Sequence, residues 1–130
     1  MSLDEGARAT LVAELREHAL VIGEVTLTSG KKASYYVDAK RAILRQPAFG
    51  AVGDLVAAKA HELGATAVGG MTMGADPIAS AALAGAGGND LIAFFVRKEK
   101  KQHGLQRWVE GPLLEAGTKV LIVELSLIHI

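Results

Sequence analysis

Hydrophobic residues recur along the first part of the chain at the spacing of an α-helix. Within residues 4–22 they fall three and four positions apart and share one face, which comprises Leu11, Val12, Leu15, Ala19 and Ile22. The pattern predicts an amphipathic helix over this range. After Gly23 the residues of 25–28 and 35–38 have the composition of two short β segments, and Ser-Gly-Lys-Lys between them favours a turn. A β-hairpin is therefore predicted there.

Helices and strands are predicted to alternate through the middle of the chain. Pro47 suits the first turn of a helix whose apolar positions recur at helical spacing until Gly64. Residues 66–70 form a short predicted strand. Pro77 then opens an alanine-rich helix that extends to about Ala86, where two glycines break it.

Two apolar runs complete the pattern. Leu91 to Val96 is continuous, which predicts a strand buried on both faces, and residues 119–124 predict a further strand. Because crossovers through a helix join parallel neighbours, the alternation predicts an α/β fold with an open, mainly parallel sheet.

Composition limits the kind of partner. The 130 residues are 50% hydrophobic, which is enough for one domain with a core, and 14 basic residues balance 14 acidic ones. Zero net charge argues against a general nucleic-acid or membrane-surface protein. The chain has no cysteine, and no His/Asp/Glu spacing favours a metal held by the protein. An acidic N-terminus without a long apolar run leads us to expect a cytoplasmic location.

Positive charge is nevertheless concentrated directly after the apolar run 91–96, at Arg97, Lys98, Lys100, Lys101 and His103. Ligands of open parallel sheets bind beyond the carboxyl ends of the strands, so these cations lie where a ligand is expected. Gly104 and its polar neighbours permit a loop that closes over an anion. A solvated charge cluster is the alternative, but the mixture of Arg, Lys and His immediately after a strand favours phosphate.

The same run resembles the catalytic loop of orotate phosphoribosyltransferases, in which R-K-E-x-K-x-H-G follows an apolar strand; here residues 97–104 are RKEKKQHG. Three more segments agree in order and spacing, TLTSGKKASYYVD at 26–38, VGGMTMGADPIASA at 68–81 and GTKVLIVE at 117–124. The resemblance implies a Rossmann-like sheet of the type I phosphoribosyltransferase kind, preceded by a helix and a hairpin hood. Residues 1–124 would be one domain, with the hood in about 1–45 and the α/β core in about 46–124.

The resemblance ends within the phosphoribosyl-pyrophosphate motif, whose apolar strand and first acid are residues 120–124, VLIVE. The second acid and the Thr- and Gly-rich phosphate loop do not follow it, and residues 125–130 read LSLIHI. We therefore expect a domain that is incomplete at its C-terminus, a tail foreign to the family, and no activity from these 130 residues alone. A natural divergent terminus is the alternative.

The resemblance implies transfer of the phosphoribosyl group from phosphoribosyl pyrophosphate to orotate, with Mg²⁺ bound through the pyrophosphate. Orotidine 5′-monophosphate and pyrophosphate would be the products. One alternative is another nucleobase phosphoribosyltransferase, because the loop contacts the pyrophosphate more than the base. The other is a ligand-sensing transcription regulator, which would need a DNA-binding module that the N-terminal helix does not supply.

Roles for individual residues follow from the resemblance. Arg97, Lys98 and Lys101 would hold the pyrophosphate charge, and His103 would donate a hydrogen bond or proton to the leaving group. Lys101 and His103 are thus the expected catalytic residues. Because the second lysine and the histidine of this loop typically reach into the neighbouring subunit's site in the family, a homodimer is implied.

The remaining implied contacts involve three segments. Thr72 and Met73 would touch pyrophosphate, Tyr36 and Val37 would lie against orotate, and Glu124 would hold the ribose hydroxyls. Some relatives carry a lysine where Met73 stands, which leaves backbone N–H groups as donors there. Many relatives also have a lysine at the position of Thr28, and either Lys31 or Lys32 could supply that charge instead.

Overall fold

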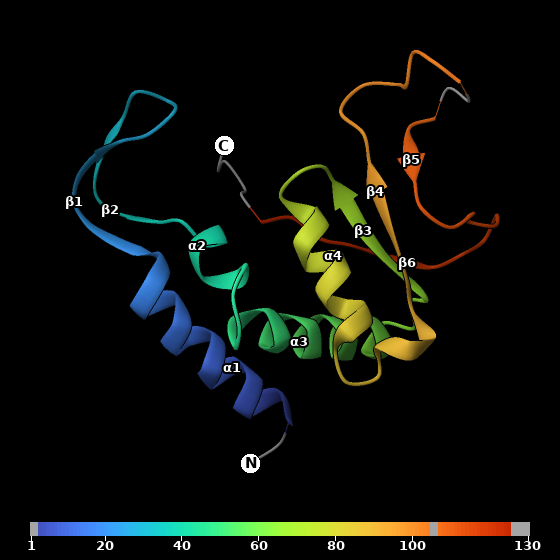
Figure 1. Ribbon diagram of the computed structural model, residues 1–130, viewed down its shortest axis with the longest axis horizontal. Helices are drawn as coiled ribbons and strands as arrows, with labels where there is room; N and C mark the ends of the chain where they lie inside the picture. Colours follow the sequence, from blue (N-terminus) through green and yellow to red (C-terminus); the bar gives the residue numbers. More distant parts are fainter. Residues whose placement is uncertain (1–2, 105–106, 126–130) are drawn as a thin grey trace.

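The N-terminal part of the chain is a helix followed by a hairpin. The computed structural model describes residues 3–104 and 107–125 (Figure 1). Helix α1 (Leu3–Glu14) continues as one π-helical turn, η1 (Leu15–Ala19), into strand β1 (Leu20–Thr26). Strand β2 (Lys32–Val37) pairs antiparallel with β1, which confirms the predicted hairpin.

The predicted extension of the first helix to residue 22 is wrong. Leu20 and Ile22 lie in β1, opposite Val37 and Tyr35. The helical spacing of apolar residues does continue to Ile22, but pairing with β2 satisfies the backbone groups of this segment in the hairpin ladder. Gly30 takes a φ of 86° in the turn, a conformation that glycine adopts without steric cost.

The later elements follow the predicted alternation. They are α2 (Lys40–Ile43), α3 (Ala48–Glu62), β3 (Ala67–Met71), α4 (Ala75–Ala84), η2 (Gly88–Asp90), β4 (Ile92–Val96), β5 (Val109–Glu110) and β6 (Val120–Ile122). Both helices predicted from proline positions and all three predicted strands are confirmed. Helix α4 begins at Ala75, two residues before Pro77, and the short elements α2, η2 and β5 were not predicted.

The second sheet has the order β5-β4-β3-β6. Strands β4 and β6 both run parallel to β3, whereas β5 returns antiparallel to β4. The α/β prediction with a mainly parallel open sheet is therefore confirmed. Figure 1 shows the hairpin β1–β2 standing apart from this sheet, with α2 between them and with α1 and α3 below.

The core lies between the sheet and two helices. Small residues of α3 and α4 form one cluster with Val68 and Leu91, in which α4 packs closely on the sheet and α3 packs closely on α4. The other face is more open in the described part of the chain, where Met71, Val120 and Ile122 are 43%, 37% and 62% exposed. Leu91 and Phe94 are buried and the other residues of the 91–96 run are half-buried, so the prediction that this run is buried on both faces holds in part. Within β4 only Phe94 is buried.

Candidate functional site

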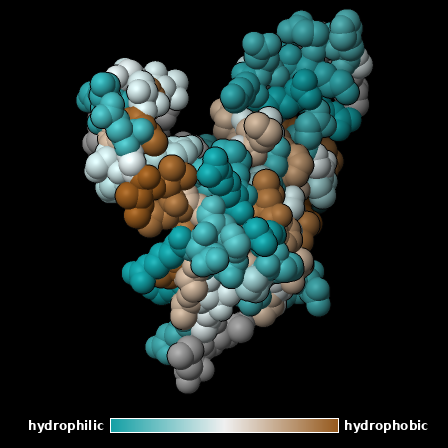
Figure 2. All heavy atoms as spheres, turned by 60° about the vertical axis from the view of Figure 1, so that its left-hand side comes forward, coloured by the Kyte–Doolittle hydropathy of each residue, from teal (hydrophilic) through white to brown (hydrophobic). Residues whose placement is uncertain are grey.

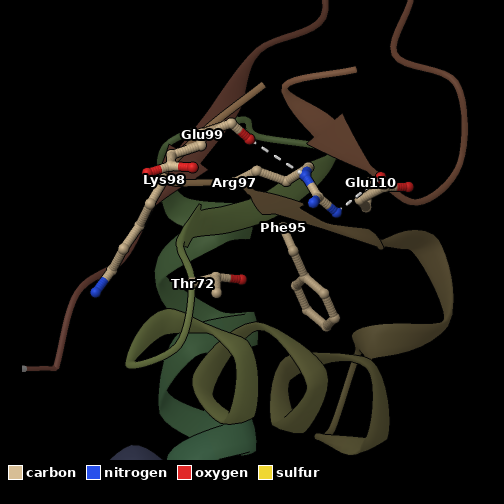
Figure 3. Close-up of a pocket in the computed structure, with 6 residues that line it drawn as sticks. All are labelled: Thr72, Phe95, Arg97, Lys98, Glu99 and Glu110. Carbon is tan, nitrogen blue, oxygen red and sulfur yellow. Dashed lines mark hydrogen bonds and ion pairs between the residues drawn. The ribbon is translucent and has the colours of Figure 1, made fainter. Parts of the chain in front are cut away.

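A pocket of about 520 Å³ opens where strands β3 and β4 end. Its lining residues come from the chain just after β3, from β4 and the chain just after it, and from β5; they are Thr72, Phe95, Arg97, Lys98, Glu99 and Glu110 (Figure 3). The sheet brings them together because the carboxyl ends of parallel strands meet at one edge. Three of the nine residues predicted to contact substrate, Thr72, Arg97 and Lys98, thus share one pocket.

Arg97 is held at several points. Its backbone N–H donates to the carbonyl of Trp108 at 2.7 Å, which extends the pairing of β4 with β5. The side chain donates from Nε to the main-chain oxygen of Glu99 at 3.3 Å and from Nη1 to Oε1 of Glu110 at 3.5 Å. Figure 3 shows the guanidinium between these partners, whereas Lys98 directs its ammonium away from them. Arg97 is therefore the oriented cation of the pocket.

Thr72 forms the opposite wall and is fixed by the start of α4. Its backbone N–H donates to the carbonyl of Val96 at 2.9 Å. Its hydroxyl donates toward both carboxylate oxygens of Asp76, each 3.0 Å away. Since a hydroxyl carries one proton, that proton is committed to Asp76, and the oxygen of Thr72 presents lone pairs to other partners. Phosphate oxygens at this wall would therefore need backbone N–H donors.

The predicted catalytic residues Lys101 and His103 lie outside this pocket. Both are exposed, and the backbone N–H of Lys101 donates to the carbonyl of Arg107 at 3.0 Å. The segment between β4 and β5 thus begins as an extended hairpin that projects from the sheet (Figure 1). Figure 2 shows the lobe at its upper right as almost entirely hydrophilic, as expected for this charged segment. Residues 105 and 106 of the loop lie outside the described part of the chain.

The other predicted contacts are not brought into the pocket. Tyr36 and Val37 lie on the exposed hairpin, and Met73 is 68% exposed. Glu124 follows β6 beside the loop that contains Thr72, since a Cβ added to Gly74 would lie 2.9 Å from its Oε1. Of the tail 125–130, only Leu125 belongs to the described residues. The lysines proposed to replace Thr28 are both exposed, Lys31 at the end of the hairpin turn and Lys32 at the start of β2, where its ammonium lies 3.1 Å from a carboxylate oxygen of Glu24.

Three pocket residues were not predicted from the sequence. Phe95 had been assigned only to the strand interior, and Glu99 and Glu110 are acids in a site expected to be basic. Glu110 reaches Arg97 only because β5 pairs with β4, with Glu110 opposite Phe95. The available signal was weak: a single acidic residue shortly after a basic loop. The pocket contains two cations and two carboxylates, so its formal charge is balanced.

The described residues contain no cluster of three or more His, Asp or Glu side chains that could hold a metal ion. Within the same residues no helix has the length and apolar character needed to cross a membrane.

Two known proteins that resemble this chain in sequence carry the same name. An orotate phosphoribosyltransferase of Corynebacterium glutamicum is 50% identical over 123 residues, which are 95% of this chain and 66% of that protein. An orotate phosphoribosyltransferase of Rhodopirellula baltica is 47% identical over 95% of this chain and 69% of its own length. No model of a protein family matches the chain.

Solved structures give the same result. Orotate phosphoribosyltransferase of Mycobacterium tuberculosis in complex with Fe(III) dicitrate superposes with a TM-score of 0.78 and 42% identity, over 91% of this chain and 66% of that one. The same protein in complex with 5-phospho-α-D-ribosyl 1-diphosphate gives a TM-score of 0.71 and 36% identity, over 91% of this chain and 64% of that one. The fold is therefore that of the type I phosphoribosyltransferases. Within this class the chain belongs to the orotate phosphoribosyltransferase family, and it spans about two thirds of the length of the relatives it matches.

Proposed function

We propose that the full protein encoded by this gene transfers the phosphoribosyl group of phosphoribosyl pyrophosphate to orotate. Orotidine 5′-monophosphate and pyrophosphate are the products, and the reaction belongs to pyrimidine biosynthesis in the cytoplasm. The observation that carries the proposal is the placement of Arg97 and Lys98 directly after β4, in one pocket with Thr72. Cations at the ends of parallel strands suit a phosphate-bearing substrate. The names of the relatives support orotate as the base.

The pocket suits the electrostatic demand of this reaction. As the anomeric carbon loses pyrophosphate, negative charge grows on the leaving group while the sugar acquires oxocarbenium character. Arg97 offers the fixed donors on the leaving-group side, and Lys98 adds a mobile charge. Lys101 and His103 complete the site when the loop meets the pyrophosphate, where His103 donates a hydrogen bond or proton to a departing oxygen.

Magnesium enters this scheme with the substrate. Mg²⁺ prefers oxygen ligands and retains several waters, so phosphate oxygens together with single carboxylates are enough to hold it. In the described part of the pocket the carboxylate of Glu110 is paired with Arg97 and that of Glu99 is turned away, so the chain offers the ion little beyond the oxygen of Thr72, which fits an ion bound mainly through pyrophosphate. When bound, the ion would neutralise part of the leaving-group charge.

The direct test is an assay of the full gene product with phosphoribosyl pyrophosphate and different bases. We expect orotidine 5′-monophosphate from orotate and no nucleotide from uracil or the purine bases. Product with another base in place of orotate would support the alternative of a different nucleobase phosphoribosyltransferase. Absence of transfer to any base, combined with tight and salt-dependent binding of duplex DNA, would support the transcription regulator instead.

A homodimer is part of the proposal, because Lys101 and His103 project away from the pocket that holds Arg97. If each loop serves the partner's pocket, mixed dimers of Arg97→Ala and Lys101→Ala subunits contain one site with both defects and one intact site. Random mixing of the two inactive variants should then restore about a quarter of wild-type activity. The two variants assayed separately are the controls. Activity no greater than theirs after subunit exchange would show that each loop acts on its own subunit.

The hairpin is proposed to hold the base. Tyr36 and Tyr35 are neighbours in β2, so their side chains point to opposite faces of the hairpin. We expect Tyr36→Ala to raise KM for orotate roughly tenfold, since an aromatic stacking pair is worth on the order of 1 kcal/mol beyond area burial. Tyr36→Phe keeps the ring and should retain wild-type KM.

Steady-state kinetics with orotate as the varied substrate measure this effect, and Tyr35→Ala is the matched control on the other face. Equal increases in KM for Tyr36→Ala and Tyr35→Ala would indicate loss of hairpin structure rather than loss of a base contact. In that case the proposed division into a hood of about 1–45 and a core of about 46–124 would have no functional basis.

A further inference from the structure

Glu110 is the acidic residue of the pocket that lies against its oriented cation. Its Oε1 is 3.5 Å from Nη1 of Arg97, across a pairing of β5 with β4 that joins residues 13 positions apart. Glu99 also lines the pocket, but it accepts the Nε donor of Arg97 through its main-chain oxygen and turns its carboxylate away (Figure 3). Glu110 is thus the carboxylate that pairs with the guanidinium in this structure.

The ion pair has little value for folding. The side chains of Arg97 and Glu110 are 41% and 35% exposed, and the distance between their charged atoms is long. Pairs of this kind contribute little to stability, because solvent screens the attraction and two side chains lose freedom. The carboxylate must nevertheless repel any phosphate that enters the same pocket, since like charges at close range oppose each other even when partly screened.

We propose that Glu110 acts as an internal counter-ion of Arg97. In the empty pocket it orients the guanidinium and occupies one of its donors, and it competes with a bound pyrophosphate group for the same charge. Glu110 is therefore a positioning residue that weakens the binding of pyrophosphate. This inference rests on the proposed function, because it takes the pocket to be the pyrophosphate site.

The geometry explains how both roles coexist. A guanidinium has five N–H donors in a planar fork. Glu99 and Glu110 use one donor each, on Nε and Nη1, so the donors on Nη2 keep a fixed direction toward a ligand. A pyrophosphate that accepts hydrogen bonds from the guanidinium through two of its oxygens must share the Nη1 donor with Glu110 or displace Glu110 from it. Release of the product restores that bond.

The test is the affinity of the full gene product for inorganic pyrophosphate in the presence of Mg²⁺, measured by isothermal titration calorimetry. We expect Glu110→Gln, which keeps the shape and removes the charge, to lower Kd on the order of tenfold. Product inhibition by pyrophosphate should strengthen by the same factor. Glu115→Gln is the matched control, because Glu115 is exposed in the same segment, lies outside the pocket and changes the net charge equally.

Coupling to Arg97 separates this role from a merely structural one. In an Arg97→Ala background Glu110→Gln should have a much smaller effect on Kd, and the double-mutant cycle should show the difference. If Glu110→Gln does not fold, Glu110→Asp serves instead. It withdraws the carboxylate by one methylene and should tighten binding at least about twofold, by the same repulsion argument.

The outcomes distinguish the two proposals. Pyrophosphate binding that depends on Arg97 but is the same in Glu110→Gln and Glu115→Gln, or weaker in Glu110→Gln, would overturn the counter-ion role and leave the proposed function standing. Pyrophosphate binding that Arg97→Ala does not weaken would overturn both, since the pocket would then not be the pyrophosphate site.

Discussion

Replacement of Lys101 or His103 by alanine is expected to lower kcat about 100-fold or more in the full gene product. Both side chains are exposed on the segment between β4 and β5, so their removal leaves the core unchanged. Under the proposed function they meet the pyrophosphate mainly as its charge develops, and a donor used in the transition state contributes to kcat more than to substrate binding. Steady-state kinetics, with thermal melting as the test of folding, measure the effect.

The loop itself supplies the controls. Lys100 and Gln102 occupy the two variable positions of R-K-E-x-K-x-H-G. Lys100 carries the same charge as Lys101, and both residues are exposed. Lys100→Ala and Gln102→Ala should therefore retain turnover within about threefold of wild type, as expected for surface substitutions away from the chemistry. If Lys101→Ala behaves like Lys100→Ala, the basic run is a solvated charge cluster.

Much of the α/β core could be predicted from the sequence because its signals are local. The proline positions and helical spacing that mark α3 and α4 act within single elements, and the apolar run of β4 is long enough to be distinct. Their order then implies parallel pairing, since a helix crossover joins parallel strands. The position of Arg97 and Lys98 at the strand end follows from that order alone.

Elements that depend on distant partners could not be predicted. Strand β5 has two residues, Val109 and Glu110, and they become a strand only by pairing with Phe95 and Val96. The start of β1 at Leu20 is similar, because the helical spacing extends through Ile22 and only the pairing with β2 decides against it. The contact of Glu110 with Arg97 depends on such a pairing, so neither residue type nor spacing indicates it.

The residues of the candidate site divide in the same way, into those that local sequence signals predict and those that depend on distant segments. Thr72, Arg97 and Lys98 follow directly from strand ends and are found together in the pocket. Residues assigned through other segments, such as Tyr36 on the hairpin and Lys101 in the loop, lie outside that pocket. Their roles remain predictions that the experiments above test.

Gly70→Ala is expected to destabilise the protein by about 3 kcal/mol, at the upper end of the cost of overpacking a core. A Cβ at this position would meet the carbonyl of Val123 and would lie 2.8 Å from Cβ of Ala75. The first contact is with backbone and cannot be relieved by a side-chain rotation. The substitution must therefore move the chain after β6 or the start of α4, and both border the loop of Thr72.

Urea denaturation of the full gene product measures this loss. Gly50→Ala is the matched control, because its Cβ would meet only the side chain of Gln46, at 3.0 Å, and alanine is favoured over glycine within a helix such as α3 by up to about 1 kcal/mol. We expect Gly50→Ala to be neutral or slightly stabilising. Because Thr72 is two residues from Gly70 and Glu124 follows Val123, Gly70→Ala should also weaken pyrophosphate binding, even at temperatures where the variant remains folded. If Gly70→Ala had wild-type stability, the space around Gly70 between β3, the chain after β6 and the start of α4 would have to be large enough for a methyl group, contrary to the contacts described above.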